Sequence, residues 1–81
     1  MRYFFTAKFQ ENYHDFPSSI RGKFDRQLAH LLRNLSRPSL RAKKYDEARG
    51  IWQARVDKHY RFYFLVEGDC YILLSLGPHP K

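Results

Sequence analysis

Two arginines, Arg55 and Arg61, stand in neighbouring apolar runs of the stretch "WQARVDKHYRFYF". A guanidinium group stays charged and presents a planar fork of N–H donors that matches phosphate oxygens. If the two groups lie side by side, they can hold a phosphodiester and stabilise the charge that develops on it during cleavage. His59 and His79 carry imidazole groups, which can accept or donate a proton near neutral pH.

The strand register decides whether the two arginines meet. Three short antiparallel strands are predicted over residues 51–56, 60–66 and 70–76. The turns "DKH" and "EGD" join them. Because side chains alternate between the two faces of a strand, a three-residue "DKH" turn places Arg55 opposite Arg61, whereas a two-residue turn would move Arg61 to the apolar face. The apolar alternation favours the first register.

The same counting extends to the third strand. A three-residue "EGD" turn places Arg61 beside Ser75, and His59 lies one step outside Arg61. The apolar face of this strand is then predicted to consist of Cys70, Ile72, Leu74 and Leu76. Apart from the turn acids, no Asp or Glu falls on the polar face, so a bound anion would relieve the repulsion between paired arginines. The alternative is two solvated arginines stacked beside Tyr63.

An aromatic strand and a short helix are predicted to open the chain. Residues 2–9 show alternation that places Tyr3, Phe5, Ala7 and Phe9 on one face of a strand. The segment "QENYHDF", which precedes Pro17, is predicted to form a short helix.

A longer helix is predicted to follow. Apolar side chains recur at helical spacing from Ile20 to Leu35 and form one stripe. Ser18 or Ser19 is predicted to cap the first turn, and Pro38 lies just past the last one. The stripe is predicted to cover the apolar face of the strands.

Two segments are predicted as loops, namely the basic connector 37–50 and the closing residues 77–81. The chain is therefore predicted to form a single α+β domain over residues 1–81. Its order is an N-terminal strand, two helices and a three-stranded antiparallel meander (βααβββ), with the helices packed on one face of the sheet.

The composition narrows the class of partner. The 81 residues include 15 Lys and Arg against 8 Asp and Glu, a net charge of +7, which attracts polyanions such as nucleic acid. No apolar run reaches the ~18 residues of a membrane span, and the first run is too short for a signal peptide. The single cysteine, Cys70, fits a reducing cytosol, so a cytoplasmic protein without a membrane partner is predicted. The histidines and Cys70 lack paired ligand spacing, so neither a metal nor another cofactor is predicted.

The order of these elements resembles the RelE/ParE toxins of bacterial toxin–antitoxin systems. The resemblance spans nearly the whole chain and rests on the segments "PSLRAKK", "IWQARV", "YRFYF", "EGD" and "LGPHP" taken in order. For RelE-like members it implies an endoribonuclease that cleaves mRNA at the ribosome and a cognate antitoxin protein that holds it inactive. For ParE-like members it implies inhibition of DNA gyrase without nuclease residues.

The resemblance also implies roles for single residues. Arg61 matches the phosphate-stabilising residue, Arg55 a common basic position, and His79 the position of a catalytic Arg or His. Lys43 and Lys44 match the basic residues before the second strand. We predict that the RNA-binding residues are Arg41, Lys43, Lys44, His59 and Tyr63.

Metal-independent RNA cleavage uses the ribose 2′-hydroxyl as nucleophile. The protein must help to remove its proton, stabilise the phosphoryl oxygens and protonate the leaving 5′-oxygen. Arg61 and Arg55 suit the second task, and His79 or His59 the first or the third. Because the sequence ends at Lys81, a late tyrosine used by some nuclease members has no counterpart. A catalytically degenerate binding protein of the same fold therefore stays open as an alternative, as does a gyrase inhibitor.

Overall fold

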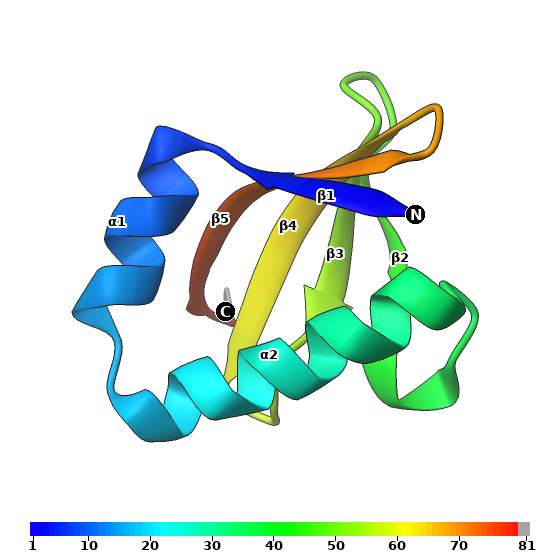
Figure 1. Cartoon of the computed structure of the whole chain (residues 1–81). Helices are drawn as coiled ribbons and strands as arrows, with labels where there is room; N and C mark the ends of the chain where they lie inside the picture. Colours follow the sequence, from blue (N-terminus) through cyan, green and yellow to red (C-terminus); the bar gives the residue numbers. More distant parts are fainter. Residues whose placement is uncertain (80–81) are drawn as a thin grey trace.

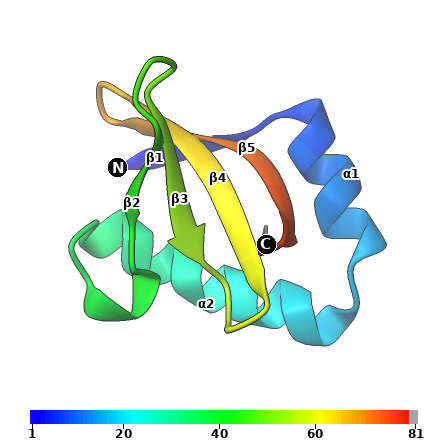
Figure 2. The same cartoon turned by 180° about the vertical axis from the view of Figure 1, so that it is seen from behind.

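The structure, a computed structural model, describes residues 1–79. Its elements are β1 (Arg2–Phe5), α1 (Ala7–Asp15), α2 (Ser18–Arg33), the 3₁₀ turn η1 (Pro38–Leu40), β2 (Lys43–Asp46), β3 (Ile51–Arg55), β4 (Tyr60–Glu67) and β5 (Cys70–Pro78). The strands form one mixed sheet in the order β1-β5-β4-β3-β2, and the helices lie against one of its faces (Figures 1 and 2). The α+β class with two helices is confirmed. The chain has one strand more than predicted, β2, and both β2 and β1 join the three strands of the predicted meander, β1 parallel to β5.

The first strand ends earlier than the predicted range 2–9. Thr6 is the N-cap of α1, and its Oγ1 accepts a hydrogen bond from the amide of Phe9 at 3.1 Å. Phe9 is fully buried, but from a helix rather than from a strand. Phe5 and Phe9 share a face under either geometry, because residues four apart do so in both a strand and a helix. The aromatic spacing alone therefore did not separate the two alternatives.

The second helix carries the predicted apolar stripe. Phe24 and Leu31 are fully buried in it. The predicted cap by Ser18 or Ser19 is wrong, since Pro17 occupies the N-cap position and no side chain caps the helix. Proline restricts φ to about −65°, and Pro17 leads into α2 with a φ of −59°. Within residues 1–79, no helix combines the length and the apolar character that a membrane crossing requires.

The connector 37–50 is not a loop throughout. The turn η1 buries Leu40 completely, and β2 pairs antiparallel with β3 at the edge of the sheet. Lys43 lies opposite Gln53, and Lys44 lies opposite Trp52, so the two lysines lie on opposite faces. The prediction missed β2 because an edge strand of basic residues has no apolar alternation to reveal it.

The β4–β5 hairpin differs from the prediction in a way that moves side chains between faces. Glu67 pairs with Cys70, so the turn has two residues, Gly68 with a φ of 58° and Asp69. Because the turn is one residue shorter than predicted, each side chain at the start of β5 lies on the opposite face of the sheet from the predicted one. Tyr71 and Leu73 are therefore buried, whereas the predicted set Cys70, Ile72 and Leu74 is not.

A β-bulge at Leu74 then returns the following side chains of β5 to the faces that the sequence predicted. Leu73 pairs with Phe64 and Ser75 with Tyr63, so Leu74 has no partner on β4. Beyond the bulge Leu76 is buried as predicted. The predicted pairing of Arg61 with Ser75 is wrong, because Arg61 lies opposite Gly77. Gly77 and Pro78 belong to β5 rather than to the predicted closing loop, of which residues 80–81 lie outside the described part of the chain.

Gln27 is a buried polar residue that links α2 to the sheet. Its Nε2 donates to the carbonyl of Ser39 at 2.9 Å and to that of Arg55 at 2.8 Å. We expect Gln27→Ala to lower the free energy of unfolding by about 1–3 kcal/mol, because two partly buried carbonyls lose their donor. Urea denaturation measures the change as a lower midpoint with an unchanged slope.

The exposed Gln10 supplies the control for this substitution. Its Nε2 also donates to a carbonyl, that of Phe5, but at the surface. We expect Gln10→Ala to stay within about 0.5 kcal/mol of the unchanged protein. Equal midpoints for the two variants would contradict a structural role for the Gln27 contacts.

Candidate functional site

The face of the sheet opposite the helices, here called the outer face, carries a basic hollow. It has a volume of about 370 Å³, and five residues line it, Arg41, Lys43, Gln53, Arg61 and His79. They come from the end of η1, from β2, β3 and β4, and from the residue after β5. Four of the five are basic, and four of the eight predicted site residues therefore meet in one place.

Backbone carbonyls hold the Arg61 side chain within the basic hollow. Its Nη1 donates to the backbone carbonyls of Asp57 at 2.7 Å and Tyr60 at 2.9 Å. Within the described residues, its Nε and Nη2 make no hydrogen bond. Two bonds to the backbone thus hold the guanidinium in place and leave donors free for a ligand.

The predicted pairing of the two arginines is confirmed, since Arg55 lies directly opposite Arg61. Burial, and then the charge of Arg55, lower the pKa of the Arg61 guanidinium. An arginine pKa starts so high that the group keeps its charge at neutral pH. The ion pairs among residues 1–79 lie elsewhere, at Arg2–Asp69, Lys23–Asp57 and Arg49–Asp46. Among the described residues, no carboxylate forms an ion pair with a basic side chain of the hollow, which suits the hollow to an anion.

The two predicted histidines meet through the backbone. The amide of His79 donates to the carbonyl of His59 at 2.7 Å, which anchors the end of β5 to the β3–β4 turn. His79 lines the basic hollow, whereas His59 is exposed and does not. His79 is thus the imidazole placed beside Arg61.

Arg41 has an unusual backbone conformation. Its φ of 46° is left-handed, which ends η1 and leads into β2. A residue with a long side chain seldom adopts this conformation, because its Cβ crowds the following carbonyl. A glycine would make the same turn without strain. The presence of arginine therefore places a cationic side chain in the lining of the basic hollow, at the cost of that strain.

Besides His59, three predicted site residues lie outside the basic hollow. Lys44 is on the helix-covered face, with its Nζ 5.3 Å from the centre of the Trp52 ring. Arg55 pairs with Arg61 but does not line the hollow. Tyr63 lies one step farther along the outer face of β4 and accepts a hydrogen bond from Gln53 at 3.2 Å.

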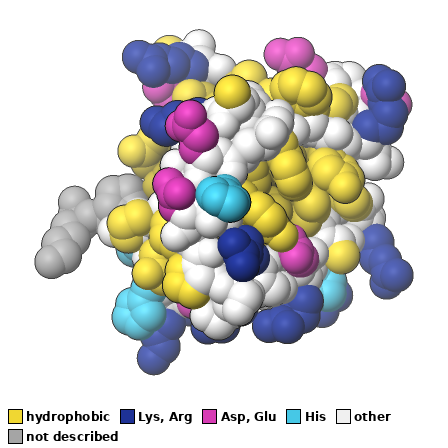
Figure 3. Space-filling view, turned by 60° about the vertical axis from the view of Figure 1, so that its left-hand side comes forward, with side chains coloured by type: hydrophobic (Ala, Val, Ile, Leu, Met, Phe, Trp, Pro, Cys, Tyr) yellow, Lys and Arg dark blue, Asp and Glu magenta, His cyan; other side chains and the backbone are white. Residues whose placement is uncertain are grey.

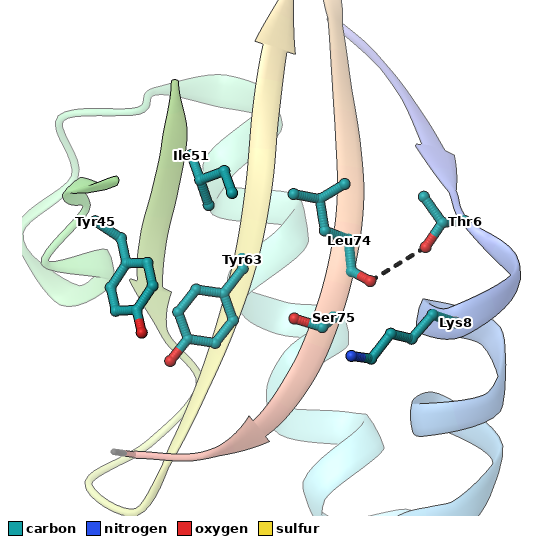
Figure 4. A pocket seen from close by; sticks show the side chains of 7 residues that line it. All are labelled: Thr6, Lys8, Tyr45, Ile51, Tyr63, Leu74 and Ser75. Atoms are coloured by element: carbon teal, nitrogen blue, oxygen red, sulfur yellow. Dashed lines mark hydrogen bonds between the residues drawn. The ribbon is translucent and has the colours of Figure 1, made fainter. Parts of the chain in front are cut away.

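Tyr63 belongs to a second hollow of about 540 Å³ on the same face, which the sequence did not reveal (Figure 4). We call it the aromatic hollow. Its lining is Thr6, Lys8, Tyr45, Ile51, Tyr63, Leu74 and Ser75. Lys8 was missed because its segment was predicted as a strand, and Tyr45 because β2 was predicted as a loop. Gln53 in the basic hollow was also missed because β2 was predicted as a loop, since its cross-strand partner is Lys43 of β2.

The turn that holds Arg61 depends on the Asp57 carboxylate. Its Oδ1 accepts the amides of His59 at 2.8 Å and Tyr60 at 2.9 Å, and its Oδ2 pairs with Lys23 at 3.1 Å. Burial by itself would raise the pKa of Asp57, but these hydrogen bonds outweigh it and the pKa lies below its ordinary value. The carboxylate therefore stabilises the fold fully above the unfolded pKa of about 3.9, and this contribution is lost as the pH falls through the lower native value.

We expect Asp57→Ala to lower the free energy of unfolding by about 1–2 kcal/mol at pH 7, because two amides lose their acceptor. The difference from the unchanged protein should shrink below about pH 4, because the carboxylate of the unfolded chain then binds a proton that the native carboxylate, with its lowered pKa, still excludes. Urea denaturation at pH 7, 4 and 2.5 measures it. Asp57→Asn keeps an oxygen for both amides and should lose less. A pH-independent difference would contradict the assignment.

A mixed sheet with two helices on one face and the other face open is the fold that this chain shares with solved RelE/ParE-type toxins. The solved structures with this fold include YoeB, RelE and YafQ toxins, so the predicted resemblance is confirmed for the fold. The YoeB/ParE toxin from Agrobacterium tumefaciens matches with a TM-score of 0.82 at 15% identity, over 99% of this chain and 100% of that one. The YoeB dimer from Staphylococcus aureus matches with a TM-score of 0.81 at 16% identity, over 99% and 98%. The isolated E. coli RelE toxin matches with a TM-score of 0.77 at 13% identity, over 99% and 85%.

At these identities the likeness concerns the fold. No protein-family model and no curated protein matches the sequence. Among residues 1–79, no three His, Cys, Asp or Glu side chains lie together as metal ligands would.

Proposed function

We propose that this chain is the toxin of a toxin–antitoxin pair and that it acts as an endoribonuclease on mRNA at the ribosome. The observation that carries the proposal is Arg61, held by two backbone carbonyls in a basic hollow that has no carboxylate partner within residues 1–79. The fold supports it, because the matched structures are named as toxins.

Each step of the proposed reaction has a candidate group. The 2′-oxygen bonds to phosphorus while the bond from phosphorus to the 5′-oxygen breaks. Arg61 stabilises the negative charge on the phosphoryl oxygens, with Arg55 beside it. His79 either takes the proton of the 2′-hydroxyl or supplies one to the 5′-oxygen. No step requires a metal ion, because RNA brings its own nucleophile.

The remaining basic residues fit a role in holding the RNA backbone. Arg41 and Lys43 line the hollow beside Arg61 and have no ion-pair partner within residues 1–79. Each contact between a basic side chain and a phosphate releases a counterion, so binding should weaken with salt. Figure 3, seen from the α1 side, shows acidic and basic side chains among one another, in contrast to the basic lining of the hollow.

An antitoxin protein is the proposed partner. Structures with this fold include YoeB in complex with YefM and RelE in complex with RelB. In this chain Met1, Tyr3 and Phe4 are at least half exposed, and β1 forms a free edge of the sheet. Exposed apolar side chains on an open edge are typical of a surface that a partner covers.

Controlled expression followed by primer extension on cellular mRNA tests the activity. We expect growth to stop and new 5′ ends to appear within translated regions, in phase with codons. Blocking initiation on a reporter message should remove the cuts from it. Growth arrest with intact mRNA and DNA-damage signalling would favour a gyrase inhibitor. Normal growth at high expression would favour a catalytically degenerate binding protein.

A further inference from the structure

The aromatic hollow has the build of a small-molecule site. Its volume of about 540 Å³ lies within the range of roughly 300–1,000 Å³ typical of ligand pockets. Ile51 and Leu74 supply aliphatic side chains, and the rings of Tyr45 and Tyr63 lie 4.9 Å apart at 62°. Figure 4 shows the two tyrosines on one side, with Lys8 reaching toward Ser75 on the other. An apolar lining with a few polar groups suits a planar heteroaromatic ring.

Two polar groups of this hollow have no partner among the described residues. The Nζ of Lys8 makes neither an ion pair nor a hydrogen bond, and the hydroxyl of Ser75 makes no hydrogen bond. The Thr6 hydroxyl differs, since it donates to the Leu74 carbonyl and accepts the amide of Phe9. Lys8 and Ser75 are therefore available to a ligand, whereas Thr6 holds the backbone.

Two strand irregularities help to build the hollow. Tyr45 and Leu74 are both residues without a cross-strand partner, at shifts in the β2–β3 and β4–β5 registers. Bulges of this kind redirect a side chain and are frequent beside functional sites. Both redirected side chains line the same hollow, from opposite sides of the sheet.

The aromatic hollow adjoins the basic hollow along β4. Tyr63 follows Arg61 by two residues on the same face, about 7 Å along the strand. Gln53 joins the two sites, because it lines the basic hollow and donates to the Tyr63 hydroxyl. A nucleotide whose phosphate lies at Arg61 can therefore place a base between the tyrosines and Lys8.

We propose that the aromatic hollow binds one unstacked nucleobase of RNA beside the cleaved phosphate, and that Lys8 selects guanine. Aromatic rings accept any base on their faces, so Tyr45 and Tyr63 supply affinity rather than choice. An ammonium group only donates, and guanine offers it the acceptors O6 and N7 on one edge. Adenine places an amino donor beside N7, which repels it. This inference rests on the proposed function and adds a base preference to it.

Titration of the full chain with mononucleotides, followed by NMR of backbone amides, tests the site without any cleavage. We expect GMP to shift the amides of Tyr63, Leu74 and Ser75 and to bind about five- to tenfold more tightly than AMP. Lys8→Met should remove the difference between the two nucleotides. Arg26→Met, which removes one exposed charge from α2, should keep it. Equal binding of GMP and AMP by the unchanged chain, or shifts confined to the basic hollow, would overturn the inference.

Cleavage mapping separates this inference from the proposed function. If guanine occupies one position beside the cut, Lys8→Met should spread the cuts over other bases at that position. A chain that binds GMP in the aromatic hollow but cuts no mRNA would refute the nuclease alone. A chain that cuts mRNA with the same base distribution after Lys8→Met would refute the base site alone.

Discussion

Arg61→Ala is expected to lower the rate of mRNA cleavage by on the order of 10²–10³-fold, because removing one preorganised donor to a developing oxyanion has an effect of this size. The backbone carbonyls of Asp57 and Tyr60 hold the guanidinium before substrate arrives, so its position does not depend on binding. Cells that express the variant should keep growing, and primer extension should show intact mRNA.

The fold should survive this substitution. Arg61 is only half-buried, and its charge opposes that of Arg55 directly across the strand pair. Relief of this repulsion offsets part of the loss of two hydrogen bonds, so the free energy of unfolding should change by no more than about 1 kcal/mol. Arg61→Lys keeps the charge but not the planar fork, and should retain a fraction of the activity.

Arg26→Ala is the matched control, since it removes an exposed arginine from α2, which packs on the other face of the sheet. It should leave cleavage unchanged. A folded Arg61→Ala protein that still arrests growth and cuts mRNA would show that the basic hollow is not the catalytic site.

Phe24→Ala is expected to produce the largest loss of stability, about 3–5 kcal/mol. Phe24 is fully buried, and its ring centre lies 5.0 Å from that of Phe9 and 5.1 Å from that of Phe62. It therefore joins both helices to the centre of the sheet, and no neighbouring side chain is free to fill the cavity. A domain of this size has a total stability of roughly 4–12 kcal/mol, so the variant should lose a quarter of its stability or more.

Urea denaturation of Phe24→Ala and Phe4→Ala provides the matched comparison. Phe4 is 58% exposed on the edge strand β1, so the same chemical change there should stay within about 0.5 kcal/mol. Phe24→Leu should recover part of the loss, because it refills most of the cavity. Similar midpoints for the two alanine variants would contradict the central place given to Phe24.

The sequence predicted the part of the site that follows from the alternation of side chains between the two faces of a strand. Arg55 and Arg61 flank a short turn between strongly alternating runs, and only one register keeps Arg61 off the apolar face. The helix stripe was predictable for a similar reason, since its repeated apolar spacing fits a single element.

The two-residue β4–β5 turn, the bulge in β5 and the strand β2 were not predicted, because none of them has a recognisable pattern in the sequence. A turn of two residues and one of three both fit "EGD", and a bulge inside the run "ILLSL" leaves no mark among similar side chains. The strand β2 owes its existence to pairing with β3 rather than to its own composition. The aromatic hollow depends on β2 and on the bulge, which supply Tyr45 and Leu74, and on the early end of β1, which places Lys8 in α1.

The parallel pairing of β1 with β5 has a consequence for the synthesis of the protein. Arg2 lies beside Cys70, and the amide of Leu76 donates to the side chain of Asn12, so the two ends of the described chain complete one sheet. Contacts between residues so distant in sequence form late in folding. Neither hollow is complete before β5 leaves the exit tunnel, since Ser75 lines one and His79 the other. A nascent chain therefore presents neither hollow in complete form until these last residues have emerged.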